Sequence, residues 1–361
     1  MGSIPWPQHN ATNSAVHLTF FEEEKFMEQR CIVLRRLGRR LGTFGIANPG
    51  IMKVTVVGAG NVGATCANVL ATREVANEVV LLDIKDGFAE GKALDIWETA
   101  PINLYDTRTV GSTNDYSKTA GSEVVVITSG LPRKPGMSRD DLIATNAGIV
   151  KTVTENVMKH SPEAILVIVS NPLDVMTYCA FLTANIDSKR VFGMAGILDT
   201  ARYRAFLAEE LNVSPKDIQA VLMGGHGDTM VPLPRYTTVG GIPVTEMINA
   251  EKLEAIVNRT KKGGGEIVNL LGTSAWYAPG AAAAQMVEAI VRDQRRVFPC
   301  CAWLQGEYGV NDLYLGVPVI LGKNGIERII ELDLNDDEKE LLRTSEAAVR
   351  DVKGVLDGLS L

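Results

Sequence analysis

The chain of 361 residues lacks the cysteine patterns of metal-binding or disulfide-stapled proteins. Its five cysteines, at positions 31, 66, 179, 300 and 301, form neither a C-x-x-C pair nor a cysteine–histidine pattern with metal-ligand spacing. Their odd number and spacing favour free thiols in a reducing compartment, and we expect no bound metal. No apolar run reaches the roughly 18 to 20 residues that a membrane helix needs, so we expect no membrane partner.

An excess of positive charge is also missing. The chain has 36 Lys and Arg residues and 43 Asp and Glu residues, which gives a net charge of −7. Because neutralising phosphates requires a basic face, we do not expect a nucleic-acid partner. The sequence has no P-loop, no G-x-S-x-G elbow, no H-E-x-x-H helix and no Y-x-x-x-K pair, which argues against the enzyme classes that use them. The length indicates two domains or one large one.

What the chain does contain is a strand, three spaced glycines and a helix. Residues 53–57 are apolar and β-branched, which predicts a buried strand. Gly58, Gly60 and Gly63 follow at G-x-G-x-x-G spacing. Gly58 permits the tight turn, Gly60 lets a pyrophosphate approach the backbone, and Gly63 lets the helix pack on the strand. An ordinary tight turn is the alternative for the glycines taken alone.

An acidic residue at the end of the next strand favours a dinucleotide site. The helix starts at Asn61 and Val62, where free N–H groups can meet phosphates. Asp83 ends the predicted strand 79–82, and its carboxylate can accept hydrogen bonds from ribose hydroxyls. The same charge would repel a 2′-phosphate, so the pattern predicts NAD rather than NADP, although Lys85 could partly offset it.

Strand-like and helical segments alternate from residue 52 to about 194, which is typical of a doubly wound parallel sheet. Strands are predicted at 53–57, 79–82, 108–111, 123–128, 164–169 and 191–192, and helices at 61–73, 88–99, 138–159 and 173–183. In the second half, helices are predicted at 200–211, 251–270, 281–292 and 336–356, the last capped by Asn335, and strands at 219–223, 230–232, 236–239, 296–304, 316–321 and 326–330. We therefore predict an α/β protein, with a Rossmann doubly wound parallel sheet over 52–195 and an α+β catalytic domain over 196–361.

The first 51 residues have no such alternation, so we predict an N-terminal extension that is largely disordered. They lack a continuous apolar core followed by a small-residue cleavage site, which argues against a secretory signal and favours a cytoplasmic protein. Residues 31–42 are basic and free of acidic residues, as in organelle-targeting helices, so targeting to an organelle stays open.

Histidine is scarce, and one histidine is displayed between glycines. Beyond residue 51 the chain has only His160 and His226. His160 lies at the end of a predicted surface helix, where a solvated role explains it. His226 follows an apolar strand in the segment MGGHGD, and its ordinary pKa near working pH suits proton transfer. A loop histidine without a catalytic role is the alternative.

A carboxylate that fixes the tautomer of a histidine makes it a better base. Asp199 and Asp228 are the candidates. We expect Asp199 to open the helix 200–211, where an N-cap role would explain it equally well. Arg202 lies three residues on and therefore on the same helix face, so one helix could offer a carboxylate to His226 and a guanidinium to an anionic substrate.

Two loops follow buried strands, at the sheet edge where ligands bind. The segment 130–139 is rich in glycine and proline and could act as a lid, with Arg133 and Arg139 turning toward a doubly anionic substrate. Asn171 follows the predicted strand 164–169 and can donate and accept hydrogen bonds at the nicotinamide end of the crevice. A basic surface loop and an Asn-Pro turn are the respective alternatives.

Together these motifs resemble the lactate/malate dehydrogenase family, in order and at family spacing, from residue 52 to 361. The resemblance is strongest to the malate-specific members, and it implies reversible hydride transfer between (S)-malate and NAD+. It implies that His226 takes the hydroxyl proton while Asp199 orients the imidazole. It further implies that Arg202 clamps the C1 carboxylate, that Arg139 polarises the carbonyl oxygen and that Arg133 pairs with the second carboxylate.

The same resemblance implies the residues that line the rest of the pocket. Asn171 and Ser274 are expected at the substrate, and Asn61, Val62, Asn146, Val169 and Asn171 join Gly58, Gly60, Gly63 and Asp83 at the cofactor. Family members form dimers or tetramers, which points to the predicted helices 88–99 and 251–270 as contact surfaces.

Two other functions stay open on the sequence. A lactate or other 2-hydroxy acid dehydrogenase is the alternative within the family, but its substrate would leave the Arg133 guanidinium desolvated and unpaired. A non-enzymatic dinucleotide-binding module would explain the glycines and Asp83. It would leave the arginines and the pair of His226 and Asp199 without a purpose.

Overall fold

The computed structural model describes residues 52–132 and 138–359. The predicted extension over 1–51 and Arg133, in the predicted lid, lie outside these residues.

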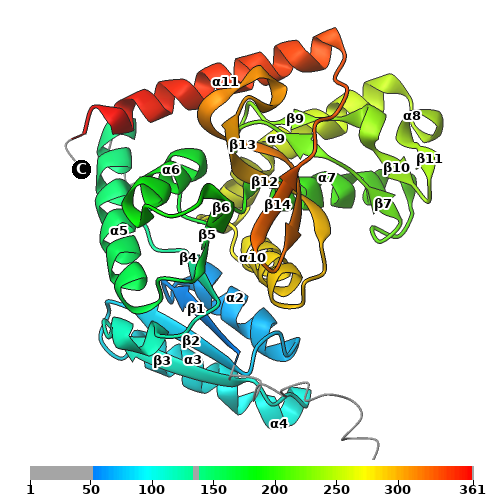
Figure 1. Cartoon of the computed structure of the whole chain (residues 1–361). Helices are drawn as coiled ribbons and strands as arrows, with labels where there is room; N and C mark the ends of the chain where they lie inside the picture. The colour runs from blue at the N-terminus through cyan, green and yellow to red at the C-terminus, as the bar shows by residue number, and fades with distance from the viewer. Residues whose placement is uncertain (1–51, 133–137, 360–361) are drawn as a thin grey trace, which may run out of the picture. The chain divides into compact units, whose positions relative to one another are not determined.

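The first part of the described chain forms a parallel sheet with helices on both faces (Figure 1). Its strands are β1 (Lys53–Val57), β2 (Glu78–Asp83), β3 (Arg108–Thr113), β4 (Val124–Ile127), β5 (Ile165–Ile168) and β6 (Val191–Gly193), and its helices are α2 (Asn61–Thr72), α3 (Phe88–Glu98), α4 (Ala100–Asn103), α5 (Arg139–His160) and α6 (Leu173–Ala184), with 3-10 turns η1 (Tyr116–Thr119) and η2 (Ser188–Arg190). The strand order β3-β2-β1-β4-β5-β6 is that of a doubly wound dinucleotide-binding sheet. The predicted Rossmann fold is confirmed.

The helices divide between the two faces of this sheet. Buried side chains of α2, α3 and α10 (Tyr277–Val291) pack on one face, and those of α5, α6 and α11 (Asp336–Asp357) pack on the other. Covered on both sides, β4 and β5 are buried along their whole length, which explains their unbroken apolar sequences VVVI and ILVI.

The second part adds antiparallel strands to the same sheet. The strands β12 (Arg296–Gln305), β13 (Asn311–Gly322) and β14 (Gly325–Ile329) pair antiparallel, and β12 joins β6 at Cys301 and Gly193. Around them lie helices α7 (Ala195–Leu211), α8 (Val244–Met247) and α9 (Ala250–Leu271), the 3-10 turns η3 (Pro234–Tyr236) and η4 (Glu307–Gly309), a sheet of β7 (Ile218–Gln219), β10 (Thr238–Val239) and β11 (Ile242–Pro243), and a pair of β8 (Leu222–Met223) and β9 (Val231–Pro232). The predicted mixed α+β character is confirmed. The domain boundary at 195/196 stays a prediction.

Several predicted elements in the second half had wrong bounds, among them the helix predicted over 281–292, which begins at Tyr277. The helix predicted over 200–211 begins at Ala195, so Asp199 lies inside it and is not its N-cap. Gly196 lies in the first turn of this helix, where a side chain would collide with Pro299 of β12. The strand predicted over 219–223 is two short strands in different sheets, and the strand predicted over 316–321 begins at Asn311.

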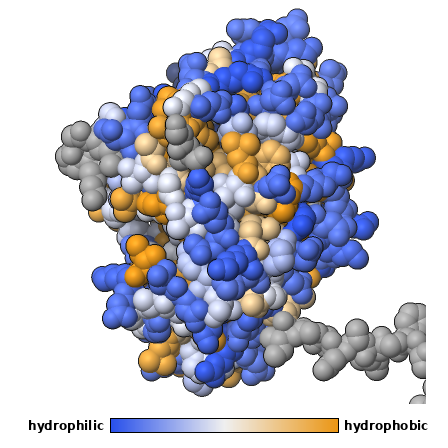
Figure 2. All heavy atoms as spheres, turned by 60° about the vertical axis from the view of Figure 1, so that its left-hand side comes forward, coloured by the Kyte–Doolittle hydropathy of each residue, from blue (hydrophilic) through white to orange (hydrophobic). Residues whose placement is uncertain are grey.

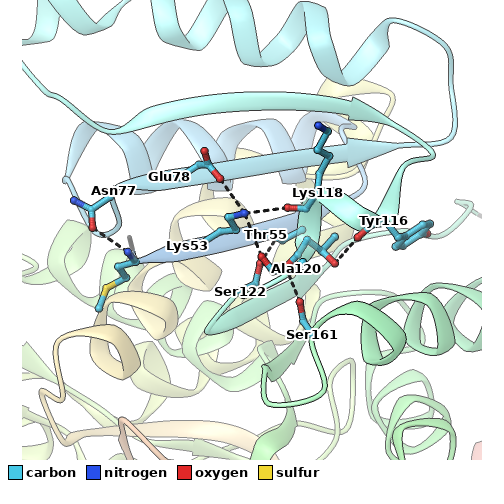
Figure 3. A network of polar contacts seen from close by, with 11 residues as sticks. Lys53, Thr55, Asn77, Glu78, Tyr116, Lys118, Ala120, Ser122 and Ser161 are labelled. Atoms are coloured by element: carbon cyan, nitrogen blue, oxygen red, sulfur yellow. Dashed lines mark hydrogen bonds and ion pairs between the residues drawn. The ribbon is translucent and has the colours of Figure 1, made fainter. Parts of the chain in front are cut away.

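Polar contacts fix the amino-terminal ends of the central strands (Figure 3). The Lys53 ammonium lies 3.1 Å from the Glu78 carboxylate and donates to the carbonyls of Lys118 and Ala120. The Thr55 and Ser122 hydroxyls lie 2.7 Å apart. These contacts hold the amino-terminal ends of the strands together, whereas ligands bind such sheets beyond the carboxyl ends of the strands.

The surface in Figure 2 is largely hydrophilic, with separate hydrophobic patches and no continuous apolar belt on the face shown. Among the helices of residues 52–132 and 138–359, none combines the length and the apolar character needed to cross a bilayer.

Candidate active site

The glycine loop between β1 and α2 has the geometry that its spacing predicts. Gly58 has a φ of +105°, a conformation that side chains rarely adopt. A Cβ on Gly63 would collide with the carbonyl oxygen of Gly58, so only glycine allows α2 to lie this close to the strand end. In front of Gly60, at the N-cap of α2, a Cβ would meet nothing within 4 Å. That open space suits a phosphate approaching the helix N-terminus.

Asp83, at the end of β2, closes the other side of this loop. Its Oδ2 accepts a hydrogen bond from the Ala59 N–H at 2.7 Å, and its Oδ1 accepts one from the Lys85 N–H at 3.0 Å. A carboxylate has about four acceptor positions, so two remain for ribose hydroxyls. Gly58, Gly60 and Asp83 line a cavity of about 270 Å³ beside Tyr116. These residues fit the adenosine and phosphate half of a dinucleotide.

We expect Gly63→Ala to destabilise the apoprotein by roughly 1–3 kcal/mol, because its Cβ meets main-chain atoms that cannot move aside. Gly60→Ala is the matched control: its Cβ has open space, so stability should hold while affinity for NADH falls. Thermal unfolding and NADH titration of both variants measure this difference. Equal stabilities would contradict the role given to Gly63.

A larger cavity of about 450 Å³ continues from the first, with Thr128, Gly130 and Leu131 shared between them. Seven of the predicted site residues line it: Val62, Asn146, Val169, Asn171, Arg202, His226 and Ser274. Together the two cavities form one groove along the carboxyl ends of the strands, where such sheets bind ligands.

The buried Asn146 side chain joins two loops at the wall of this cavity. Its Oδ1 accepts from the Leu131 N–H at 2.8 Å, and its Nδ2 donates to the carbonyls of Leu131 and Asn171, at 3.1 and 2.7 Å. The loop after β4 and the loop after β5 are therefore held at a fixed spacing. Asn171 itself is exposed at the cavity wall.

His226, Asp199 and Arg202 form a connected group at the end of the cavity. The His226 Nδ1 lies 2.8 Å from the Asp199 Oδ2, and the Arg202 Nη1 donates to the Asp199 Oδ1 at 3.2 Å. Asp199 is only 3% exposed, so these two partners balance its charge. Burial lowers the pKa of His226, but the charge and hydrogen bond of Asp199 outweigh it, and the net pKa is raised.

Two glycines put His226 in this place. The main chain of Gly224 pairs with Gly316 of β13, and the Gly225 N–H donates to the Ser345 Oγ of α11 at 2.8 Å. A Cβ on Gly225 would collide with Val349. The segment therefore passes tightly between β13 and α11, and His226 emerges at the cavity.

The sequence matches two models of one family over nearly the whole described chain. Residues 52–193 match the model described as lactate/malate dehydrogenase, NAD binding domain, and residues 197–354 match its alpha/beta C-terminal domain. The chain belongs to the lactate/malate dehydrogenase family. The predicted family and the predicted cofactor, NAD, are confirmed.

Individual members of the family are similar over almost their full length. The malate dehydrogenase of Cytophaga hutchinsonii is 72% identical over 308 residues, which cover 85% of this chain and 99% of that relative. The solved malate dehydrogenase of Salinibacter ruber is 57% identical with a TM-score of 0.82, covering 85% of this chain and 98% of that one. A Cryptosporidium parvum lactate dehydrogenase, solved with lactic acid and the dinucleotide, is 38% identical with a TM-score of 0.82, covering 85% and 98%.

Three of the residues considered for the substrate or the histidine lie apart from the group of His226, Asp199 and Arg202 or outside the described chain. Arg139, in the first turn of α5, is exposed and lines a separate cavity of about 200 Å³, which His226 also borders. Asp228 lines the same small cavity, while the carboxylate bonded to the imidazole is that of Asp199. Arg133 lies outside the described residues.

The sequence analysis did not identify two features that lie beside His226, Asp199 and Arg202. Asp174 of α6 is buried against the main chain of His226, although its place two residues after Asn-Pro looked like an ordinary helix start. A Cβ on Gly263 of α9 would lie 3.2 Å from the Arg202 Cδ, and Gly264 lines the cavity. Consecutive glycines inside a helix cost about 1 kcal/mol each, which was a signal that something packs there.

Proposed function

We propose that this chain is an NAD-dependent malate dehydrogenase that interconverts (S)-malate and oxaloacetate. The observation that carries the proposal is the cavity in which the imidazole of His226, backed by Asp199, and the guanidinium of Arg202 border the same space beside the dinucleotide groove. The names of the relatives at 55–72% identity support this substrate.

His226, Asp199 and Arg202 are proposed to have different roles in the reaction. Because Asp199 occupies the Nδ1 of His226, the Nε2 is left to receive the hydroxyl proton of malate. The Asp199 carboxylate then stabilises the imidazolium, and Arg202 holds the C1 carboxylate with its planar fork. Bound NAD+ supplies the acceptor for the hydride. Arg139 at the start of α5 is proposed to reach the carbonyl oxygen, and Asn171 and Ser274 to contact the substrate.

Most of the cofactor residues are assigned on the groove that they border, and Asn61 and Gly63 on their place in the first turn of α2. We place the dinucleotide against Gly58, Gly60, Asn61, Val62, Gly63, Asp83, Asn146, Val169 and Asn171. Asp83 would accept the ribose hydroxyls, and the N-terminus of α2 would face the pyrophosphate.

Selection of a dicarboxylate is assigned to Arg133, on the family resemblance of its segment. We expect a higher kcat/KM for oxaloacetate than for pyruvate, because a second carboxylate can pair with a guanidinium and a methyl group cannot. Arg133→Gln should move the ratio toward pyruvate. Steady-state assays with both substrates measure it. A wild-type preference for pyruvate would refute the malate assignment in favour of lactate, and an unchanged ratio in the variant would refute the role of Arg133.

We also propose a homodimer or homotetramer in the cytoplasm. Exposed apolar side chains support the two predicted contact helices: Leu94 on α3 is 57% exposed, and Leu270 on α9 is 78% exposed. Sedimentation of the full chain should give a multiple of its 39.0 kDa mass. A mass of one chain at micromolar concentration would refute it.

A further inference from the structure

A second carboxylate, besides that of Asp199, lies against the His226 loop. Asp174 is in the first turn of α6 and is 7% exposed. Its Oδ2 accepts a hydrogen bond from the main-chain N–H of His226 at 3.0 Å. Its Oδ1 accepts one from the Sγ of Cys301 at 3.1 Å, and Cys301 is fully buried in β12. One carboxylate therefore ties together a helix of the parallel sheet, the histidine loop and the antiparallel strands.

Both contacts are made by donors, as expected of an ionised carboxylate. Burial is the largest effect and leaves the pKa of Asp174 raised above its ordinary value, while the hydrogen bonds from Cys301 and His226 lower it in part. The start of α6 adds the positive end of a helix dipole, which also favours the negative form. The negative charge of Asp174 in turn acts on His226 to raise its pKa.

The other groups around His226 are few. The charged ones are Asp199 and Arg202 from α7, Arg139 from α5 and Asp228 from its own loop, whereas α9 contributes Gly264 and Val268 and α11 contributes Ala348, Val349 and Val352. Asp174 is thus the one charge from α6 that faces the loop among the described residues. Among the described residues, Asp174 is also the only charged side chain that forms a hydrogen bond with the main chain of His226.

We propose that Asp174 is a positioning residue for the proton transfer: its buried carboxylate fixes the main chain of His226 and adds a second negative charge near the imidazole. The inference rests on the proposed function, because it concerns the same base. Asp199 fixes the ring through Nδ1, and Asp174 fixes the backbone from which the ring projects. The two carboxylates together set the direction of Nε2 and the proton affinity of the base.

Two substitutions of Asp174 distinguish the effect of its hydrogen bond to the His226 main chain from the effect of its negative charge. Asp174→Asn keeps an oxygen for the His226 N–H and removes the charge. We expect its kcat/KM for malate to keep most of its maximum value while the acid limb of the pH profile moves to lower pH. The sign follows because losing a nearby negative charge destabilises the imidazolium, and malate oxidation needs the neutral ring. Asp174→Ala also removes the acceptor, and we expect kcat to fall by about tenfold to a hundredfold.

Two further variants control for a general loss of stability. Cys301→Ser keeps a donor toward the Asp174 Oδ1 and should behave like wild type in kcat. Glu338→Gln changes another buried carboxylate, paired with Arg235 at 3.0 Å and outside the cavity, and should lower stability without moving the pH profile. If Asp174→Asn and Glu338→Gln lose activity only in proportion to their folded fraction, with unmoved profiles, Asp174 is a structural acid and the proposal is wrong.

A titration that needs no turnover separates this inference from the proposed function. The chain has four histidines, so NMR of histidine-labelled full-length protein can resolve His226, assigned by its loss in His226→Ala. Asp174→Asn should lower the pKa of His226, with the His160 signal as an internal reference. Absence of oxaloacetate turnover in the wild type would refute the function and leave this result standing. An unmoved His226 titration in Asp174→Asn would refute the inference, even in an active enzyme.

Discussion

Replacing His226 with alanine should lower kcat for malate oxidation by roughly 10²- to 10⁴-fold and leave NADH binding nearly unchanged. The imidazole is the only group of the cavity that is held by a carboxylate in a proton-accepting orientation, among the residues that the structure describes. The glycine loop and Asp83, which we assign to the dinucleotide, border a different part of the groove. Catalysis and cofactor affinity should therefore separate in this variant.

The measurements are initial rates by NADH absorbance and a fluorescence titration with NADH. His160→Ala is the matched control, because His160 lies at the far end of α5 and should affect neither quantity. Equal loss of turnover and NADH affinity in His226→Ala would mean that the variant is misfolded or that His226 is structural. Retained turnover would refute its role as the base.

Arg202→Lys should lower kcat/KM for oxaloacetate by about tenfold to more than a hundredfold, mainly through a higher KM. Lysine keeps the charge but lacks the planar fork that pairs with both oxygens of a carboxylate, and a hydrogen bond to a charged group contributes roughly 1.5–3 kcal/mol. The shorter reach also weakens the contact to Asp199, now 3.2 Å from Nη1. Some loss of kcat should therefore accompany the change in KM.

The same helix offers a control for this substitution. Arg204 lies two residues further along α7 and donates to the Pro215 carbonyl at 2.9 Å, away from the cavity. Arg204→Lys should leave kcat/KM close to the wild-type value. If both variants lose the same amount, helix stability rather than carboxylate recognition explains the effect, and the clamp assigned to Arg202 is wrong.

Local signals predicted the elements around the glycine loop well. The strand β1, the glycines and the start of α2 are contiguous, so periodicity and spacing were enough to place them at the observed residues. The first turn of α7 could not be predicted, because Gly196 looks like a helix breaker until its contact with Pro299 is known. Helix propensity there is overridden by tertiary packing.

The contacts of the proposed catalytic residues could not be predicted from local sequence. His226 and Asp199 were singled out from residue type and neighbours, and their contact across 27 residues depends on how α7 and the glycine segment meet in the fold. Asp174 was missed because its partners lie 52 and 127 residues away. An acidic residue in a helix first turn is so common that the sequence gives it no distinction.

The packing of α11 against Gly224 and Gly225, through Ser345 and Val349, ties the histidine segment to an element that leaves the ribosome after it. The parallel sheet depends on later residues as well, because α10 packs with α2 and α3 on one face and α11 packs with α5 and α6 on the other. The segment of His226, the proposed base, cannot reach its final position until α11 has been translated and docked. We therefore expect the dinucleotide groove and the proposed base to be completed together, late in synthesis.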